Sequence, residues 1–295
     1  MIGVKSSSNY ISITRNISLN NMMIAMDGGI SLLVREPERE IDNYPSSRIQ
    51  KGLIVIHNNK DLSEEGVGFG VPVLKFGQKT IFPGYGRITI RKDEDTTFVN
   101  IDYDLNLAEM TYFKGRRIES GIFYKIAGYF SRLHRKYPFS RKLLTRCSIA
   151  MRRAFAIETR FEATAPAGLV KVEYNICTDG IIHISADLST VKKKRCTEVM
   201  IMNEQGADYF DTCCDSEGTY LTGNEIGSWS ETFSNEVSFI DPHNNIAFTL
   251  SRVRGSRMFF GRELLANRLA WSGLAYSLSP HLSNFAYDIR IGAGK

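Results

Sequence analysis

The residues best suited to chemistry lie close together in the last quarter of the chain. Trp229 occupies a loop flanked by glycine and serine, and the carboxylates Glu225 and Glu231 lie on either side of it. Arg252 lies in the strand-like run at 246–253, and Arg254 follows it directly. An aromatic ring can stack on an apolar ligand face, carboxylates accept hydrogen bonds, and arginines hold an anionic group through two donors. The group therefore indicates a ligand-binding pocket, unless Trp229 packs inward and the charges are solvated.

A proton-transfer site can be assembled from the same region and two histidines. Glu231 is the carboxylate next to Trp229, and His183 and His243 lie in or beside predicted strands. A carboxylate and an imidazole can divide the roles of general acid and general base. We therefore expect Glu231, together with His183 or His243, to carry any acid–base reaction, without a redox cofactor.

The cysteines and histidines are scattered along the chain. There are five cysteines with no C-x-x-C pair, and the five histidines show no H-x-x-x-H spacing. This pattern predicts free thiols in a reducing compartment, no metal site and no bound cofactor, and hence a cytoplasmic protein. Cys147 falls on an apolar helical stripe, so we expect it to be a small core residue.

Alternating apolar and polar residues predict strands over most of the chain. Residues 170–176 and 182–188 alternate on either side of an Asp-Gly pair at 179–180, and the Asp-Gly pair at 27–28 separates two further runs. Aspartate and glycine between alternating runs are a strong signal for an antiparallel hairpin. Roughly fifteen short strands predict a mostly β protein, a large antiparallel β-sandwich. In architecture alone it resembles the supersandwiches of galactose-mutarotase-like proteins.

The middle of the chain breaks the strand pattern. Residues 114–153 hold twelve basic residues and one acid, so this segment carries +11 while the rest of the chain carries −6. Apolar residues recur at helical spacing over 119–137 and again beyond Ser140, with Pro138 between the two runs. We predict a basic α-helical hairpin, inserted at 114–156, whose apolar stripes cover the sheet. The residues that could bind an anionic surface are Lys125, Arg132, Arg135, Lys136, Arg141, Lys142, Arg146, Arg152 and Arg153.

No flexible linker separates this hairpin from the β segments at 1–110 and 157–295. Amphipathic helices need an apolar surface to cover, so we predict one β-sandwich domain over 1–295 rather than two domains. The glycine-rich stretch at 66–70 precedes Val-Pro-Val instead of a helix, which predicts a turn or bulge beside a sheet rather than a phosphate-binding loop.

Two functions of different class fit these patterns. A rigid β scaffold with the Trp229 cluster favours a protein that binds or modifies a saccharide, in a cleft built near 66–72 and 225–257. The basic hairpin alternatively indicates a peripheral module that docks on anionic lipid, a polyanion or an acidic protein. Sequence-specific nucleic-acid binding has no supporting motif. No apolar run approaches the ~20 residues of a transmembrane segment.

Overall fold

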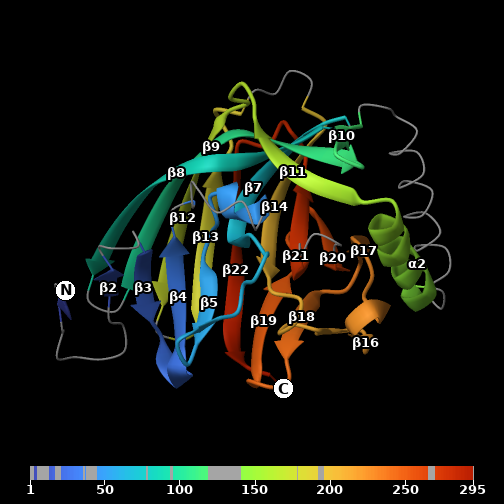
Figure 1. Ribbon diagram of the computed structural model, residues 1–295. Coiled ribbons are helices and arrows are strands. Elements are labelled where there is room, and N and C mark those ends of the chain that lie inside the picture. Colours follow the sequence, from blue (N-terminus) through green and yellow to red (C-terminus); the bar gives the residue numbers. More distant parts are fainter. Residues whose placement is uncertain are drawn as a thin grey trace.

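The computed structural model describes residues 3–4, 13–16, 21–35, 37, 45–77, 79–93, 96–118, 141–177, 179–191, 196–264 and 270–294. Within these ranges the chain is mostly antiparallel β-structure, as the alternation predicted. The strands form a small N-terminal sheet and one large sheet, which spans both β segments of the sequence (Figure 1).

The small sheet is a series of antiparallel neighbours in chain order. The hairpin predicted at the Asp-Gly pair 27–28 is confirmed, because β3 and β4 pair around a 3-10 turn, η1 (Asp27–Gly29), in which Gly28 has a φ of 70°. A second 3-10 turn, η2 (Pro45–Arg48), precedes β5. The strands are β1 (Gly3–Val4), β2 (Ile13–Asn16), β3 (Asn21–Ala25), β4 (Ile30–Arg35), β5 (Ile54–His57) and β6 (Lys60–Asp61).

The large sheet joins strands that are far apart in the sequence. The hairpin predicted at 179–180 is confirmed as β12 and β13, and Gly180 has a φ of 83°. In spatial order the strands are β16 (Tyr220–Thr222), β15 (Thr212–Asp215), β18 (Glu236–Asp241), β19 (Ile246–Ser251), β22 (Asn284–Ala293), β13 (Ile181–Asp187), β12 (Leu169–Cys177), β9 (Thr96–Phe113), β8 (Lys79–Asp93), β7 (Gly68–Phe76), β14 (Glu198–Gln205), β21 (Ala270–Leu278), β20 (Arg257–Leu264) and β17 (Ser230–Thr232), with β10 (Arg116–Arg117) and β11 (Ile157–Ala163) paired to β9.

One hydrophobic core joins the two sheets. Leu32 and Val55 of the small sheet belong to the same buried cluster as Tyr103 and Tyr174 of the large sheet. Both tyrosines are fully buried, and their hydroxyls are hydrogen-bonded at 2.7 Å. The small sheet thus covers part of the large one, and in Figure 1 its strands β3 to β5 lie in front of β12 and β13.

The strands β7, β14 and β21 are buried on both faces, which explains their long apolar runs. One face contributes Leu74 and Ile201 to the main core. The other face contributes Val73, Met200 and Ala275 to a second buried cluster, and the candidate site lies against that cluster.

The glycine-rich stretch forms the bulge that the sequence predicted. Gly68 and Gly70 both have φ near 80°, and the pairing of β7 with β14 shifts register between Met202 and Asn203. The Gly70 N–H donates to the Asn203 side-chain oxygen at 3.0 Å. The bulge starts β7 and does not open a helix.

The structure describes part of the predicted hairpin and corrects where it begins. One α-helix, α2 (Arg141–Ala154), occurs in the described ranges, whereas the first predicted helix, at 119–137, lies outside them. Residues 114–118, assigned to the hairpin from sequence, instead form a turn and β10, paired to β9.

The prediction that the stripe of α2 packs into the core is also wrong. Cys147 is exposed, and Leu143, on the same stripe, is 64% exposed. Helical spacing identifies an apolar face but not what covers it. No helix among the described residues is long and apolar enough to span a membrane.

Candidate functional site

A cavity of about 220 Å³ lies on the face of the large sheet that carries the second apolar cluster. Its walls come from one face of seven consecutive strands, from β11 through β9, β8, β7, β14 and β21 to β20. The sheet therefore wraps around the cavity, and in Figure 1 β8, β9 and β11 pass over the ends of the other strands. Helix α2 lies at its side and contributes Arg152 to the lining.

Strand alternation sets which side chains reach the cavity. On β14, Met200, Met202 and Glu204 line it, whereas Val199 and Ile201 enter the main core. The neighbouring strands alternate in the same way, so the cross-strand partner of Met200, Val73 of β7, also lines the cavity. A carboxylate thus ends a row of apolar side chains on one strand face.

Two glycines paired across β20 and β21 make the space that the site occupies. Gly261 pairs with Gly273. A Cβ on Gly261 would lie 2.9 Å from the backbone nitrogen of Trp229, and a Cβ on Gly273 would lie 2.9 Å from Cγ of Glu204. Because neither glycine has a side chain, the Trp229 backbone can approach β20 closely, and the Glu204 side chain has room beside β21.

Glu204 is one of two deeply buried carboxylates of the cavity, since it and Glu65 are each 4% exposed. It accepts a hydrogen bond from the Val67 N–H at 3.3 Å. Burial raises the pKa of Glu204 to about 8, a shift that the hydrogen bond from Val67 opposes and the charges of Glu263 and Glu109 increase. Glu204 is therefore mostly protonated at neutral pH and can donate a hydrogen bond.

Two further carboxylates in the lining have a raised pKa. Desolvation raises the pKa of Glu109 on β9, and the charge of Glu263 adds to this effect. Desolvation also raises the pKa of Glu65, although the Ser46 hydroxyl donates a hydrogen bond to it. Carboxylates whose pKa is raised by burial and like charge are typical of functional sites.

Glu263 and the basic residues complete the electrostatics of the cavity. Arg152 of α2 forms an ion pair with Glu263 at 3.4 Å. The other basic side chain, Lys75 of β7, pairs with Glu198 at 2.9 Å. Four glutamates and two basic residues line the cavity, so its lining carries more acidic than basic groups.

Aromatic rings form two pairs at the cavity. Trp229 stacks on Trp271 with ring centroids 4.5 Å apart. Phe82 and Phe161 meet edge to face at 5.1 Å. Trp271 is buried and Trp229 is half-buried, so a ligand can reach the ring of Trp229.

Of the ligand-binding residues predicted from sequence, Trp229 alone lines this cavity, and Arg152, predicted to bind an anionic surface, lines it as well. Glu225 instead accepts hydrogen bonds from Thr222 at the start of the 3-10 turn η4 (Gly223–Glu225). Arg252 donates to the Phe233 carbonyl at 2.9 Å, and Arg254 lies exposed in a turn after β19.

The three residues predicted for acid–base chemistry are not brought together. His183 on β13 is exposed and lies 2.7 Å from Asp288. His243 is exposed in the turn between β18 and β19. Glu231 lies on β17, eight positions from β13 in the strand order, with an Arg257 nitrogen 4.0 Å away.

The predicted anionic-surface residues divide into three groups. Arg146 and Arg153 are exposed on α2, whereas Arg152 turns toward Glu263. The side chains of Arg141 and Lys142 lie outside the described part of the structure. The remaining four, Lys125, Arg132, Arg135 and Lys136, fall in 119–140, which is also outside it.

Sequence reasoning missed the cavity carboxylates. Glu204 comes just after the apolar run 199–202, and the two residues before it on the same strand face are the methionines Met200 and Met202. A carboxylate at an inward position of a buried strand is costly unless it has a role, and that was the available signal. Among the described residues, no group of three or more His, Cys, Asp or Glu side chains is arranged to hold a metal ion.

The sequence matches no known protein family, and no curated protein matches it either. Among solved structures, the chain is similar to HI1317, with 10% identity over 99% of both chains and a TM-score of 0.43. It is also similar to a mutant of the heparan sulfate lyase HepC from Pedobacter heparinus, with 6% identity, a TM-score of 0.44, and coverage of 100% of this chain and 37% of that one.

A third similar structure is the GH36 alpha-galactosidase AgaB from Geobacillus stearothermophilus, with 8% identity and a TM-score of 0.44. The coverage is 96% of this chain and 41% of that one. The chain thus spans about two fifths of the length of these two enzymes. Likeness at this level is too distant to indicate a function.

Proposed function

We propose that the cavity binds a small saccharide and that Glu204 serves it as a proton donor. One observation carries this proposal: Glu109, Glu204 and Glu263 line the same cavity as the Trp229–Trp271 stack. Hydroxyl groups of a sugar find acceptors and donors in such carboxylates, and its C–H face finds an aromatic ring. The scaffold we propose is a β-sandwich in which the small sheet covers part of the large one.

The size of the cavity supports a ligand of about one sugar ring. Pockets for drug-sized ligands span ~300–1,000 Å³, and this cavity is smaller, at about 220 Å³. Its lining combines carboxylates such as Glu204 and Glu263 with apolar residues such as Met200 and Val73. A sugar ring, which has polar hydroxyl groups and apolar C–H faces, matches that combination.

The chemistry available to such a ligand is proton transfer without a redox cofactor. Glu204, with its pKa raised to about 8, holds a proton at neutral pH. Glu263, ion-paired with Arg152, is the group that would accept one. Two carboxylates held in different environments are the usual basis for dividing acid and base roles.

Binding is tested by thermal shift and calorimetry with neutral hexoses, uronic acids and amino sugars. The Trp229→Ala variant should bind the responding sugar roughly 5- to 30-fold more weakly, because loss of one stacking face costs about 1–2 kcal/mol. Phe233→Ala is the matched control, since Phe233 is 71% exposed and lies outside the cavity lining.

Two outcomes would contradict the proposal. One is the absence of any response to all three sugar classes. The other is a sugar that binds Trp229→Ala and the wild-type protein equally well. A third variant, Glu204→Gln, separates binding from proton transfer, because its amide still donates a hydrogen bond but cannot release a proton. It should bind the sugar and leave it unconverted.

A further inference from the structure

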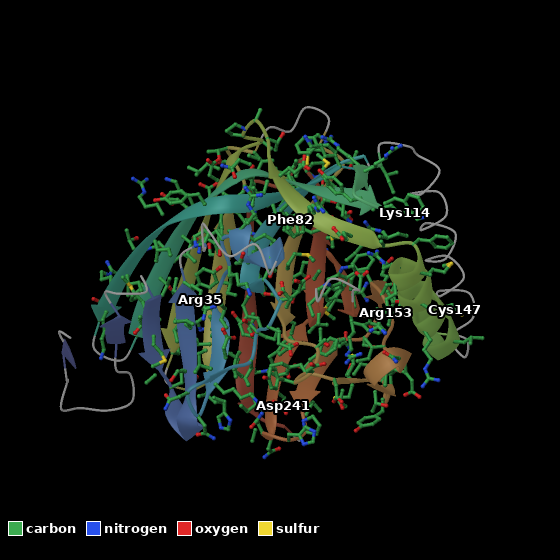
Figure 2. The ribbon with its side chains drawn as sticks, viewed as in Figure 1. Arg35, Phe82, Lys114, Cys147, Arg153 and Asp241 are labelled. Carbon is green, nitrogen blue, oxygen red and sulfur yellow. The ribbon has the colours of Figure 1, made fainter. Side chains whose placement is uncertain are left out.

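The apolar side of helix α2 faces away from the protein. Leu143 is 64% exposed, Phe155 just beyond the helix is 47% exposed, and Met151 is 36% exposed. Cys147 is exposed as well, and Figure 2 shows it on the outer side of α2. Large apolar side chains that gather on one exposed surface usually mark an interaction site.

The helical spacing shows that this exposure is a continuous strip. Leu143, Cys147, Ala150 and Ala154 follow one another at intervals of four, three and four residues, and all four are exposed. Such intervals place side chains on one line along a helix. On the opposite side of α2, Arg152 reaches the cavity and pairs with Glu263. The helix thus turns a charged residue inward and its apolar strip outward.

Positive charge borders the apolar strip. Arg146 and Arg153 are exposed along one margin of it, and α2 contains no acidic residue. A turn next to the end of the helix adds Lys114 and Arg116, both exposed, and the Lys114 N–H donates to the Ala156 carbonyl at 3.2 Å. Figure 2 places Lys114, Arg153 and Cys147 on the same side of the molecule.

We propose that α2 docks flat on an anionic membrane surface. In this arrangement Leu143, Met151 and Phe155 enter the boundary between headgroups and acyl chains, and Arg146 and Arg153 bind lipid phosphates. A strongly amphipathic helix with a basic margin is the usual element for such docking, and its apolar face enters to a depth of ~5–10 Å. A bilayer takes up both features of α2 at once, the arginines at the lipid phosphates and the apolar strip below them.

Docking is tested by sedimentation with vesicles of phosphatidylcholine, with and without phosphatidylserine, at low and high salt. The full-length protein should bind only the anionic vesicles and should be released by salt. Each cation close to an anionic surface strengthens binding roughly fivefold, so Arg146→Gln/Arg153→Gln should bind about 30-fold more weakly. Removing the apolar anchors in Leu143→Ser/Phe155→Ser should weaken binding roughly 100-fold.

Two control variants match these changes elsewhere on the protein. Arg87→Gln/Arg91→Gln removes the same charge from exposed side chains on β8. Tyr85→Ser removes an aromatic ring that is 49% exposed. Both controls should sediment with anionic vesicles like the wild-type protein. If they weaken binding as much as the α2 variants do, the effect is one of net charge or general apolarity, and α2 is not the docking site.

Cys147 offers a direct report on what covers the strip. In a Cys177→Ser/Cys214→Ser background, a polarity-sensitive fluorophore on Cys147 should shift to the blue with anionic vesicles and stay unchanged with neutral ones. If residues 119–140 cover the strip instead, Cys147 will resist thiol reagents and the protein will not sediment with vesicles. Retention on polyglutamate that survives Leu143→Ser/Phe155→Ser, without vesicle binding, would assign the arginines to an acidic macromolecule. Either result overturns the proposal.

Discussion

The Glu204→Gln variant should gain about 3 kcal/mol of stability relative to the wild-type protein when the pH rises from 4.5 to 7. Burial holds the pKa of Glu204 at about 8 in the folded protein, against an ordinary value of 4.5. Between these values the folded protein keeps a proton that the unfolded chain releases. Folding therefore becomes less favourable by about 1.4 kcal/mol for each pH unit, and a glutamine, which does not titrate, removes that dependence.

The sign of this effect is specific to a raised pKa. The stabilisation linked to the Glu204 proton is fully present below pH 4.5 and is lost as the pH rises through about 8. Urea unfolding of both proteins at several pH values between 4.5 and 8 measures it. If the glutamine amide itself changes the unfolding free energy by a constant amount, the whole curve of unfolding free energy against pH shifts, and its slope stays the same.

Glu173→Gln is the control, because Glu173 is exposed on β12. Its unfolding free energy should run parallel to that of the wild-type protein at every pH. If the Glu204→Gln curve also runs parallel to the wild-type curve, Glu204 is ionised in the folded protein. That result would contradict the proposal that Glu204 is a proton donor in the cavity.

Other groups shape the same pH profile. The pKa of Glu64 is raised to about 7 and that of Glu109 is raised as well, both chiefly by desolvation, so they too favour folding at lower pH. Asp215 acts in the opposite sense, because hydrogen bonds from Ser234 and Thr219 outweigh its desolvation and lower its pKa. The contribution of Asp215 to folding stability is present above about pH 4, and it is lost as the pH falls and the carboxylate is protonated.

Local patterns predicted local structure well in this chain. Both Asp-Gly hairpins occur where the alternating runs and the turn residues placed them. The pairing of distant strands could not be predicted in the same way. The pair β7 and β14 closes over more than a hundred residues, and nothing in either strand specifies its partner beyond an apolar face.

The site was predictable only in part for the same reason. Trp229 was identified because a tryptophan in a polar loop is unusual wherever it lies. Glu204 and Glu263 each look like ordinary strand residues, and they share a cavity only because β14, β21 and β20 are neighbours. For α2 the amphipathic pattern was read correctly, and its assumed partner, the sheet, was not the surface that the strip faces.

Gly273→Ala should destabilise the protein by about 3 kcal/mol and should also open the cavity next to Glu204. A Cβ at this position would lie 2.4 Å from the Asn203 carbonyl oxygen and 2.9 Å from Cα of Glu204, both of which are backbone atoms. No side-chain rotation relieves such contacts, so β21 must move away from β14. That movement lets water reach Glu204, and its pKa should fall toward the ordinary value for a glutamate.

Gly292→Ala is the matched control, because it is also a strand glycine without a positive φ, and its Cβ would meet nothing within 4 Å. It should be neutral or stabilising by up to about 1 kcal/mol, since alanine loses less conformational freedom on folding than glycine does.

Urea unfolding of both variants at pH 5 and pH 8 distinguishes two effects of Gly273→Ala. A loss of stability that is larger at pH 5 than at pH 8 shows that the strain has also released the proton of Glu204. An equal loss at both pH values would show that Gly273 supports the sheet but not the protonation of Glu204, and a loss no larger than that of Gly292→Ala would show that the sheet yields without cost.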